Sequence, residues 1–153
     1  MKPILFSLQF RGRARPLRSD RLRFTLSAPS SAVLTTVGPH GISGAIEEVA
    51  GAEARLESDV AFGGPTFEDA GTIDFGRGHM LRFRSAAAGC LTASPDANLR
   101  HGASVREVKG GAGQFEGATG FITSNFLLSD TGEVTDNGLG LIFIREGKEV
   151  KRA

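Results

Sequence analysis

Apolar and polar residues alternate along the chain with a period of two, which is the pattern of strands with one buried face. The clearest example runs over residues 4–15, where apolar or small residues alternate with polar residues and arginines. Between turn signals the pattern recurs in further candidate strands: 21–26, 33–37, 42–49, 52–62, 67–75, 79–85, 89–94, 103–109, 114–129 and 139–144. These segments predict an all-β chain of eight to ten strands with little helix.

An antiparallel barrel of about eight strands removes exposed strand edges, and we expect this fold. A two-sheet sandwich is the alternative. The length of 153 residues predicts a single domain over residues 1–153. Residues 27–32 are expected to break a strand, and 47–58, rich in Ala and Glu, could instead form a short helix. The eleven phenylalanines could line a ligand cavity or fill the core, and the pattern leaves both open.

Basic residues are concentrated at the N-terminus: residues 1–25 hold seven Lys or Arg and one acidic residue. An organellar presequence and a nucleic-acid arm are possible interpretations of the region 1–26. The period-two spacing favours a strand with a solvated basic face, which could also steer an anionic partner. Because the phenylalanines and the arginines point to opposite faces of the predicted strand, they cannot bind nucleic acid together, and we expect no nucleic-acid partner. Residues 145–153 form a charged tail.

No secretory signal or apolar run long enough to span a bilayer is visible, so the sequence predicts a cytoplasmic protein with no membrane partner. Cys90 is the single cysteine, which excludes an internal disulfide, and it is expected to be a small buried hydrophobe. The three histidines have no metal-ligand spacing. We therefore expect neither a metal nor another cofactor.

His79 is the first candidate for catalysis. In the predicted strand 79–85 it shares a face with Leu81 and Phe83, so it could point into the barrel and act as a general acid or base. It directly follows Gly78, and it could instead cap the hairpin through hydrogen bonds.

Glu48 and Asn125 are two further candidates. Glu48 shares parity with Ile46, and a carboxylate inside an apolar barrel would have a raised pKa suited to proton transfer. Glu47 is adjacent, so one of the two must face solvent in a strand. Asn125 shares a face with Phe121 and could orient a substrate carbonyl or stabilise an oxyanion, or it could bond to the backbone.

The segment 111–120, GAGQFEGATG, and the upstream segment 74–79, DFGRGH, carry a likeness to a known family. A dinucleotide-binding fingerprint would need a following helix, whereas 121–128 continues as a predicted strand. The two segments resemble the allene oxide cyclase and dirigent barrel superfamily, over roughly residues 52–144. The matched glycines are structural positions, and no catalytic residue is carried over from this resemblance.

The resemblance implies a calycin-like barrel of about eight strands with an internal pocket, assembled as a homo-oligomer, a dimer or trimer. Members of this superfamily close an unsaturated fatty epoxide, steer radical coupling of phenols, or cyclise polyketide-like products. All of these reactions depend on the confinement of a reactive substrate. We therefore expect a cofactor-independent cyclase or isomerase that binds an apolar or polyunsaturated molecule in the barrel interior. A non-catalytic carrier of a hydrophobic ligand and a scaffold with a filled core are the alternatives.

Overall fold

The computed structural model describes residues 1–147 as nine strands and one short 3-10 helix, η1 (Gly113–Phe115). The strands are β1 (Lys2–Arg18), β2 (Arg21–Gly38), β3 (Gly41–Gly63), β4 (Thr66–Asp74), β5 (Met80–Ser85), β6 (Gly89–Ala93), β7 (Leu99–Ala112), β8 (Thr119–Ser129) and β9 (Glu133–Ile144). The predicted charged tail lies outside the described residues from position 148 onward.

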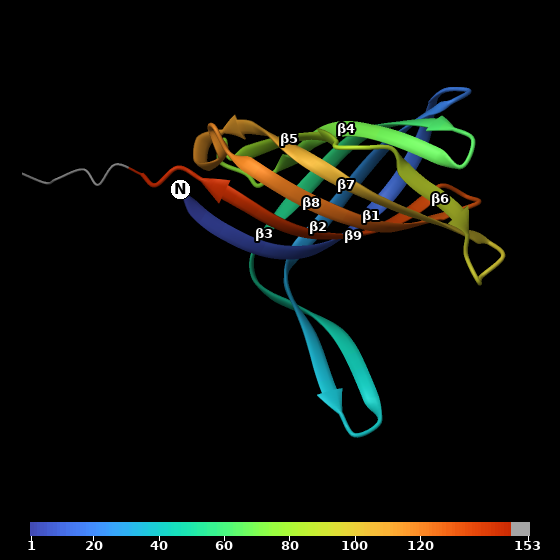
Figure 1. Ribbon diagram of the computed structural model, residues 1–153, viewed down its shortest axis with the longest axis horizontal. Coiled ribbons are helices and arrows are strands. Elements are labelled where there is room, and N and C mark those ends of the chain that lie inside the picture. Colours follow the sequence, from blue (N-terminus) through green and yellow to red (C-terminus); the bar gives the residue numbers. More distant parts are fainter. Residues whose placement is uncertain (148–153) are drawn as a thin grey trace, which may run out of the picture.

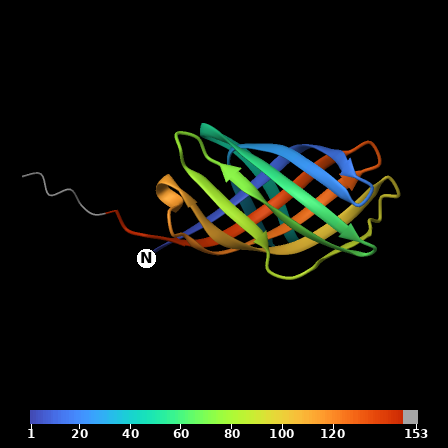
Figure 2. The same cartoon turned by 90° about the horizontal axis from the view of Figure 1, so that it is seen from above.

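All nine strands belong to one antiparallel sheet that closes in a ring (Figures 1 and 2). Around the ring the order is β3-β2-β1-β9-β8-β7-β5-β4, and β4 pairs again with β3. The short strand β6 joins the ends of β4 and β7. The prediction of an all-β chain with little helix is confirmed, and the two separate sheets of a sandwich are not formed.

Apolar side chains from alternate positions of the strands occupy the interior of the ring. Four phenylalanines are almost wholly buried there, namely Phe10, Phe24, Phe67 and Phe126. The Phe126 ring meets those of Phe24 and Phe67 edge to face, with centroids 5.4 and 5.3 Å apart. Burial of each such ring stabilises the fold by about 1.5–3 kcal/mol, so these contacts anchor strands far apart in sequence.

The basic N-terminal region is a strand, as its spacing predicted. β1 pairs with β9 along its whole N-terminal part and with β2 from Arg11 onward. Arg11, Arg13 and Arg15 lie on its exposed face. Within residues 1–147 the structure has no helix with the length and apolar character needed to cross a bilayer.

β2 and β3 run on beyond the ring as a protruding two-stranded hairpin, which we call the arm (residues Ser31–Glu48; Figure 1). The predicted strand break at 27–32 and the helix alternative at 47–58 are both wrong. β2 continues through an irregularity between Pro29 and Ser31, where the register with β3 shifts. Proline is tolerated at such bulges because no ladder hydrogen bond is required of its nitrogen. The alanines and glutamates of 47–58 pair with β2 instead of forming a helical turn.

The predicted strand 114–129 begins later than expected, at Thr119. Residues 113–115 form η1 and a turn follows, because Gly113 and Gly117 adopt φ of 62° and 69°, which end the extended backbone. Gly120, with φ of 129°, lies against the carbonyl oxygen of Leu141, so a side chain there would collide with β9. Glycine is required at position 120 by this close approach of the two backbones.

Candidate functional site

His79 lies on the surface at the end of the β4–β5 turn, and its expected position on the inward face with Leu81 is wrong. Gly76, Arg77 and Gly78 all have positive φ, which turns the chain before β5 begins at Met80. The His79 N–H donates to the Gly76 carbonyl at 3.0 Å, and its ring Nδ1 accepts from the Gln114 N–H at 3.0 Å. His79 therefore caps the hairpin and holds η1 against it.

Glu48 is exposed on the arm, where it and Arg11 line a shallow groove of about 330 Å³. Asn125 is exposed on the outer face of β8, on the same face as Phe121. The Asn125 Oδ1 lies 3.2 Å from His101 Nε2. The expectation that Glu48 and Asn125 point into the barrel is wrong, and the three candidate residues lie on separate parts of the surface.

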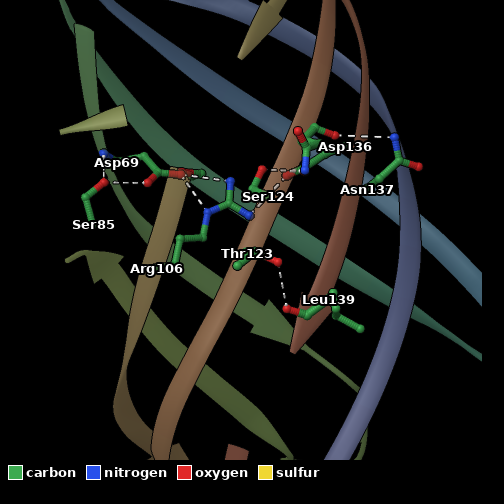
Figure 3. A network of polar contacts seen from close by, with 10 residues as sticks. Asp69, Ser85, Arg106, Thr123, Ser124, Asp136, Asn137 and Leu139 are labelled. Atoms are coloured by element: carbon green, nitrogen blue, oxygen red, sulfur yellow. Dashed lines mark hydrogen bonds and ion pairs between the residues drawn. The ribbon is translucent and has the colours of Figure 1, made fainter. Parts of the chain in front are cut away.

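A buried ionic network that the sequence analysis missed crosses the interior (Figure 3). Arg106 of β7 is about 1% exposed. Its Nε donates to Asp69 Oδ2 of β4 at 2.8 Å, and its Nη1 donates to Asp136 Oδ2 of β9 at 3.1 Å. The Nη2 atom is also 2.8 Å from Asp69 Oδ2, close enough for charge attraction although not aligned for a hydrogen bond.

Hydroxyl groups complete the network. Ser124 Oγ donates to Asp136 Oδ1 at 2.6 Å, and Ser85 Oγ donates to Asp69 Oδ1 at 2.8 Å. The Arg106 guanidinium carbon lies 4.7 Å from the centre of the Phe83 ring. Burial acts to lower the pKa of Arg106, but the attraction of Asp136 and Asp69 outweighs it, so the pKa is raised and the guanidinium stays charged.

The network ties β4, β5, β7, β8 and β9 together, and its carboxylates are engaged by groups of the same chain. This arrangement favours a structural role over chemistry on a substrate. The sequence carried a signal for it: Arg106 lies between Ser104 and Val108 on the parity that faces inward, and Asp136 follows Val134 on the same face of β9. Opposite charges on the inward faces of separate strands predict such a pair.

A cleft of about 500 Å³ opens where β2 leaves β1. Pairing between these strands ends at Arg11↔Ser27, so the N-terminal half of β1 pairs with β9 alone among the described strands. The apolar lining comes largely from Phe6, Leu8, Ala28, Val33, Ala54 and Phe75. The Phe6 and Phe75 rings meet edge to face with centroids 6.2 Å apart and form one wall.

Polar groups in the cleft are few. Glu53 is the one ionisable residue among those that line it. Ser31 Oγ is buried there and has no hydrogen-bond partner within the described part of the chain. Ser30 Oγ, by contrast, donates to the Ala52 carbonyl at 2.7 Å. The cleft thus combines apolar walls with a buried hydroxyl that has no partner within the described part of the chain, and none of His79, Glu48 and Asn125 lines it.

Cys90 is exposed, and the prediction of a buried cysteine is wrong. Its neighbours Gly89 and Leu91 face inward on β6, so alternation turns Cys90 outward. Within residues 1–147 no group of three or more His, Cys, Asp or Glu side chains is arranged to hold a metal ion. The search of protein-family models, of curated proteins and of solved structures gives no match to this chain.

Proposed function

We propose that the protein binds a small apolar molecule in the cleft at the base of the arm and acts as its carrier or sensor. The observation that carries this proposal is the largely apolar cleft of about 500 Å³, which is lined by Ser31, a residue whose buried hydroxyl has no hydrogen-bond partner within the described part of the chain. Its volume falls within the range of about 300–1,000 Å³ usual for small-molecule sites.

The lining favours a molecule that is mostly hydrocarbon with one polar end. Apolar contact with Phe6 and Phe75 would contribute roughly 25 cal/mol for each Å² removed from water. Ser31 Oγ would gain the hydrogen bond that it lacks in the free protein, and a buried unpaired polar group costs about 1–3 kcal/mol. An unsaturated fatty acid has both features.

Ligand binding can be measured with a tryptophan reporter, because the chain contains no tryptophan. Ala52 is exposed and lines the cleft, so Ala52→Trp places a single fluorophore at the site. Titration with linoleate should change its emission saturably, with a Kd of about 1–100 μM, which corresponds to roughly −8 to −5 kcal/mol.

A second substitution locates the ligand. Ala54→Leu in the reporter background fills the floor of the cleft and should weaken linoleate binding at least about tenfold, or 1.4 kcal/mol. Ala45→Leu adds the same atoms on the arm, outside the cleft, and should leave the affinity unchanged. A non-saturable signal, or equal weakening by both substitutions, would contradict the proposal. Far-UV circular dichroism verifies that each variant is folded.

A cyclase or isomerase of an unsaturated substrate is the second candidate. Two observations support it. The closed sheet agrees with the barrel that the resemblance to the allene oxide cyclase and dirigent superfamily implies. Glu53 lines the cleft, where its carboxylate could move a proton. Confinement of the unsaturated substrate in the cleft would supply the remaining rate enhancement. Glu53→Gln should then abolish turnover while linoleate binding persists, whereas the absence of any turnover by the wild-type protein would leave the carrier function alone.

A further inference from the structure

The arm lacks the support that a hairpin of its length needs. Its strands pair only with each other among the described residues, from Ser31↔Glu48 to Gly38↔Gly41, and it projects away from the ring (Figure 1). An isolated two-stranded hairpin is at best marginally stable in water. A stable arm of this kind therefore needs a surface against which to pack.

One face of the arm is apolar. Val33 lies opposite Ile46, and Val37 lies opposite Ile42, at alternate positions that share a face. Val37 and Ile42 at the tip are 80% and 77% exposed. Burial of either side chain against a partner would stabilise the contact through the hydrophobic effect. Exposed apolar residues gathered in this way mark an interaction surface.

The ring carries a second exposed apolar surface, which we call the outer face. Leu5 of β1, Leu141 of β9 and Phe121 of β8 form one row across three neighbouring strands. Leu139 and Phe143 flank this row along β9. All five side chains are at least 38% exposed.

Charge on the two surfaces is complementary in sign and in spacing. On β1, Arg11 follows Leu5 by six residues on the same face. On the arm, Val37 follows Ser31 by six residues, and Ser31 lies opposite Glu48. With the tip of an arm on Leu5, the acidic base would lie about 20 Å away, beside Arg11. Glu48 and Arg11 of one copy line the same groove, but neither has an ion pair within residues 1–147, and the Arg11 guanidinium donates to Gln9 Oε1 at 2.9 Å.

The exposed area also leaves room for such a contact. The chain has an accessible surface of 9801 Å² and a mass of 16.1 kDa. A compact monomer of that mass exposes about 7,400 Å², from 6.3 × M^0.73. The excess of about 2,400 Å² is more than residues 148–153 could add in any conformation, and a standard interface needs about 800 Å² from each partner.

We propose that two copies of this chain clasp each other, with the apolar face of each arm lying on the outer face of the other copy. Such an arrangement is two-fold symmetric, because the same two patches meet twice. The contact overlaps the cleft at Leu5 and Val33, which also line the cleft, whereas Val37, Ile42 and Leu141 lie outside it. The dimer is proposed for the protein without ligand, so its test does not depend on the ligand proposal.

Sedimentation velocity tests the clasp in the full-length protein. The wild type should sediment as a dimer, with twice the 16.1 kDa mass of the chain. The arm variant Val37→Lys/Ile42→Lys and the face variant Leu5→Lys/Leu141→Lys change exposed positions, so each should fold and sediment as a monomer. The matched control is Leu34→Lys, at an exposed leucine on the opposite face of the arm, which should remain dimeric.

Mixing the two variants separates the clasp from other contacts. The arm variant retains a native outer face and the face variant retains a native arm, so the pair can restore one of the two contacts. A 1:1 heterodimer should form from two monomeric variants, with a Kd weaker than that of the wild type. Each of five results would overturn the proposal. The wild type could be monomeric at 100 μM or have the mass of three copies, and the arm or face variant could remain dimeric. Leu34→Lys could dissociate the dimer, or the two variants could form no heterodimer. Binding of a monomeric wild type to phosphatidylcholine vesicles through the arm would also overturn it and assign the arm to a lipid surface.

Discussion

Two regions of the molecule, the ring interior around Arg106 and the arm, reverse the usual distribution of charged residues outside and apolar residues inside. The ring buries one guanidinium and two carboxylates, whereas the arm exposes four β-branched apolar side chains. Inside the ring, the carboxylates of Asp69 and Asp136 are both satisfied by the same chain. On the arm, the apolar face is half-exposed at its base and largely exposed at its tip, at Val37 and Ile42.

This difference shows which part of the chain provides contacts for these side chains and which part does not. A buried charge is tolerated only with its partners in place, so the network specifies how the strands of the ring are arranged. At the tip of the arm, by contrast, Val37 and Ile42 stay largely exposed, so the described chain does not cover them. The ring is therefore the part of the protein whose buried groups are satisfied within the chain, and the proposed ligand and partner contacts fall on the cleft and the arm.

The largest effect should come from removing the central charge of the interior. Arg106→Ala leaves two buried carboxylates without their cation and should lower the free energy of unfolding by about 3–5 kcal/mol, measured by urea denaturation. Arg23→Ala breaks the exposed, solvent-screened pair with Asp59 and should leave the urea midpoint almost unchanged. If Arg106→Ala fails to fold, Arg106→Lys provides a milder change, and a cost for Arg106→Lys no larger than that for Arg23→Ala would show that the network is dispensable.

Replacing a glycine by valine should affect thermal stability differently in the ring and in the arm. At Gly102 of β7, an added Cβ would meet the ring of Phe126 in the core, so Gly102→Val should destabilise the protein by about 1–3 kcal/mol or more. At Gly44 of the arm the nearest atom to a Cβ is the Leu34 carbonyl oxygen at 3.8 Å. Gly44→Val should therefore leave the melting temperature unchanged or raise it slightly. Thermal melts that fall equally for both would contradict this difference.

Much of the ring follows from the sequence because a half-buried strand imposes a period of two. Residues 4–15 alternate cleanly, and β1 is found there. The same rule fails for the arm, because alternation predicts a strand without saying what covers its apolar face. The segment 27–32 was misjudged for a related reason: Pro29 and the serines lower strand propensity, but a bulge accommodates them.

The candidate site was less predictable, because it depends on contacts between strands distant in sequence. Parity placed His79 inward, yet three successive residues with positive φ shift the start of β5 by one position. The cleft arises where β2 diverges from β1, and no local pattern in either strand marks that point. Arg106 and Asp136 could have been paired from their inward parity, had the register between strands been known.

Neighbouring hydroxyls on opposite faces of β8 test the inside–outside contrast at a smaller scale (Figure 3). Ser124 donates to the buried Asp136 at 2.6 Å, so Ser124→Ala should cost about 1–3 kcal/mol in urea denaturation. Thr123 lies on the exposed face, with a 3.4 Å bond to the Leu139 carbonyl, and Thr123→Val should change stability by less than about 0.5 kcal/mol. A larger loss at Thr123 than at Ser124 would contradict the assignment of these two faces.

The smallest effect concerns a surface ion pair on the same strand as Arg106. A hydrogen bond from Lys109 to Glu107 lowers the pKa of Glu107, with its attraction for Lys109 and Arg84 acting in the same direction. A lowered carboxyl pKa stabilises the fold above the unfolded-state pKa, and that contribution is lost as the pH falls through the folded-state pKa. Because both side chains are solvated, the expected change is in titration and not in the melting temperature. Lys109→Ala should raise the pKa of Glu107 towards its ordinary value in an NMR titration, and 1 M salt should produce much of the same shift in the wild type. If Lys109→Ala leaves that pKa unchanged while the Arg106 variant unfolds, the surface pair contributes nothing and charge matters to this fold only inside the ring.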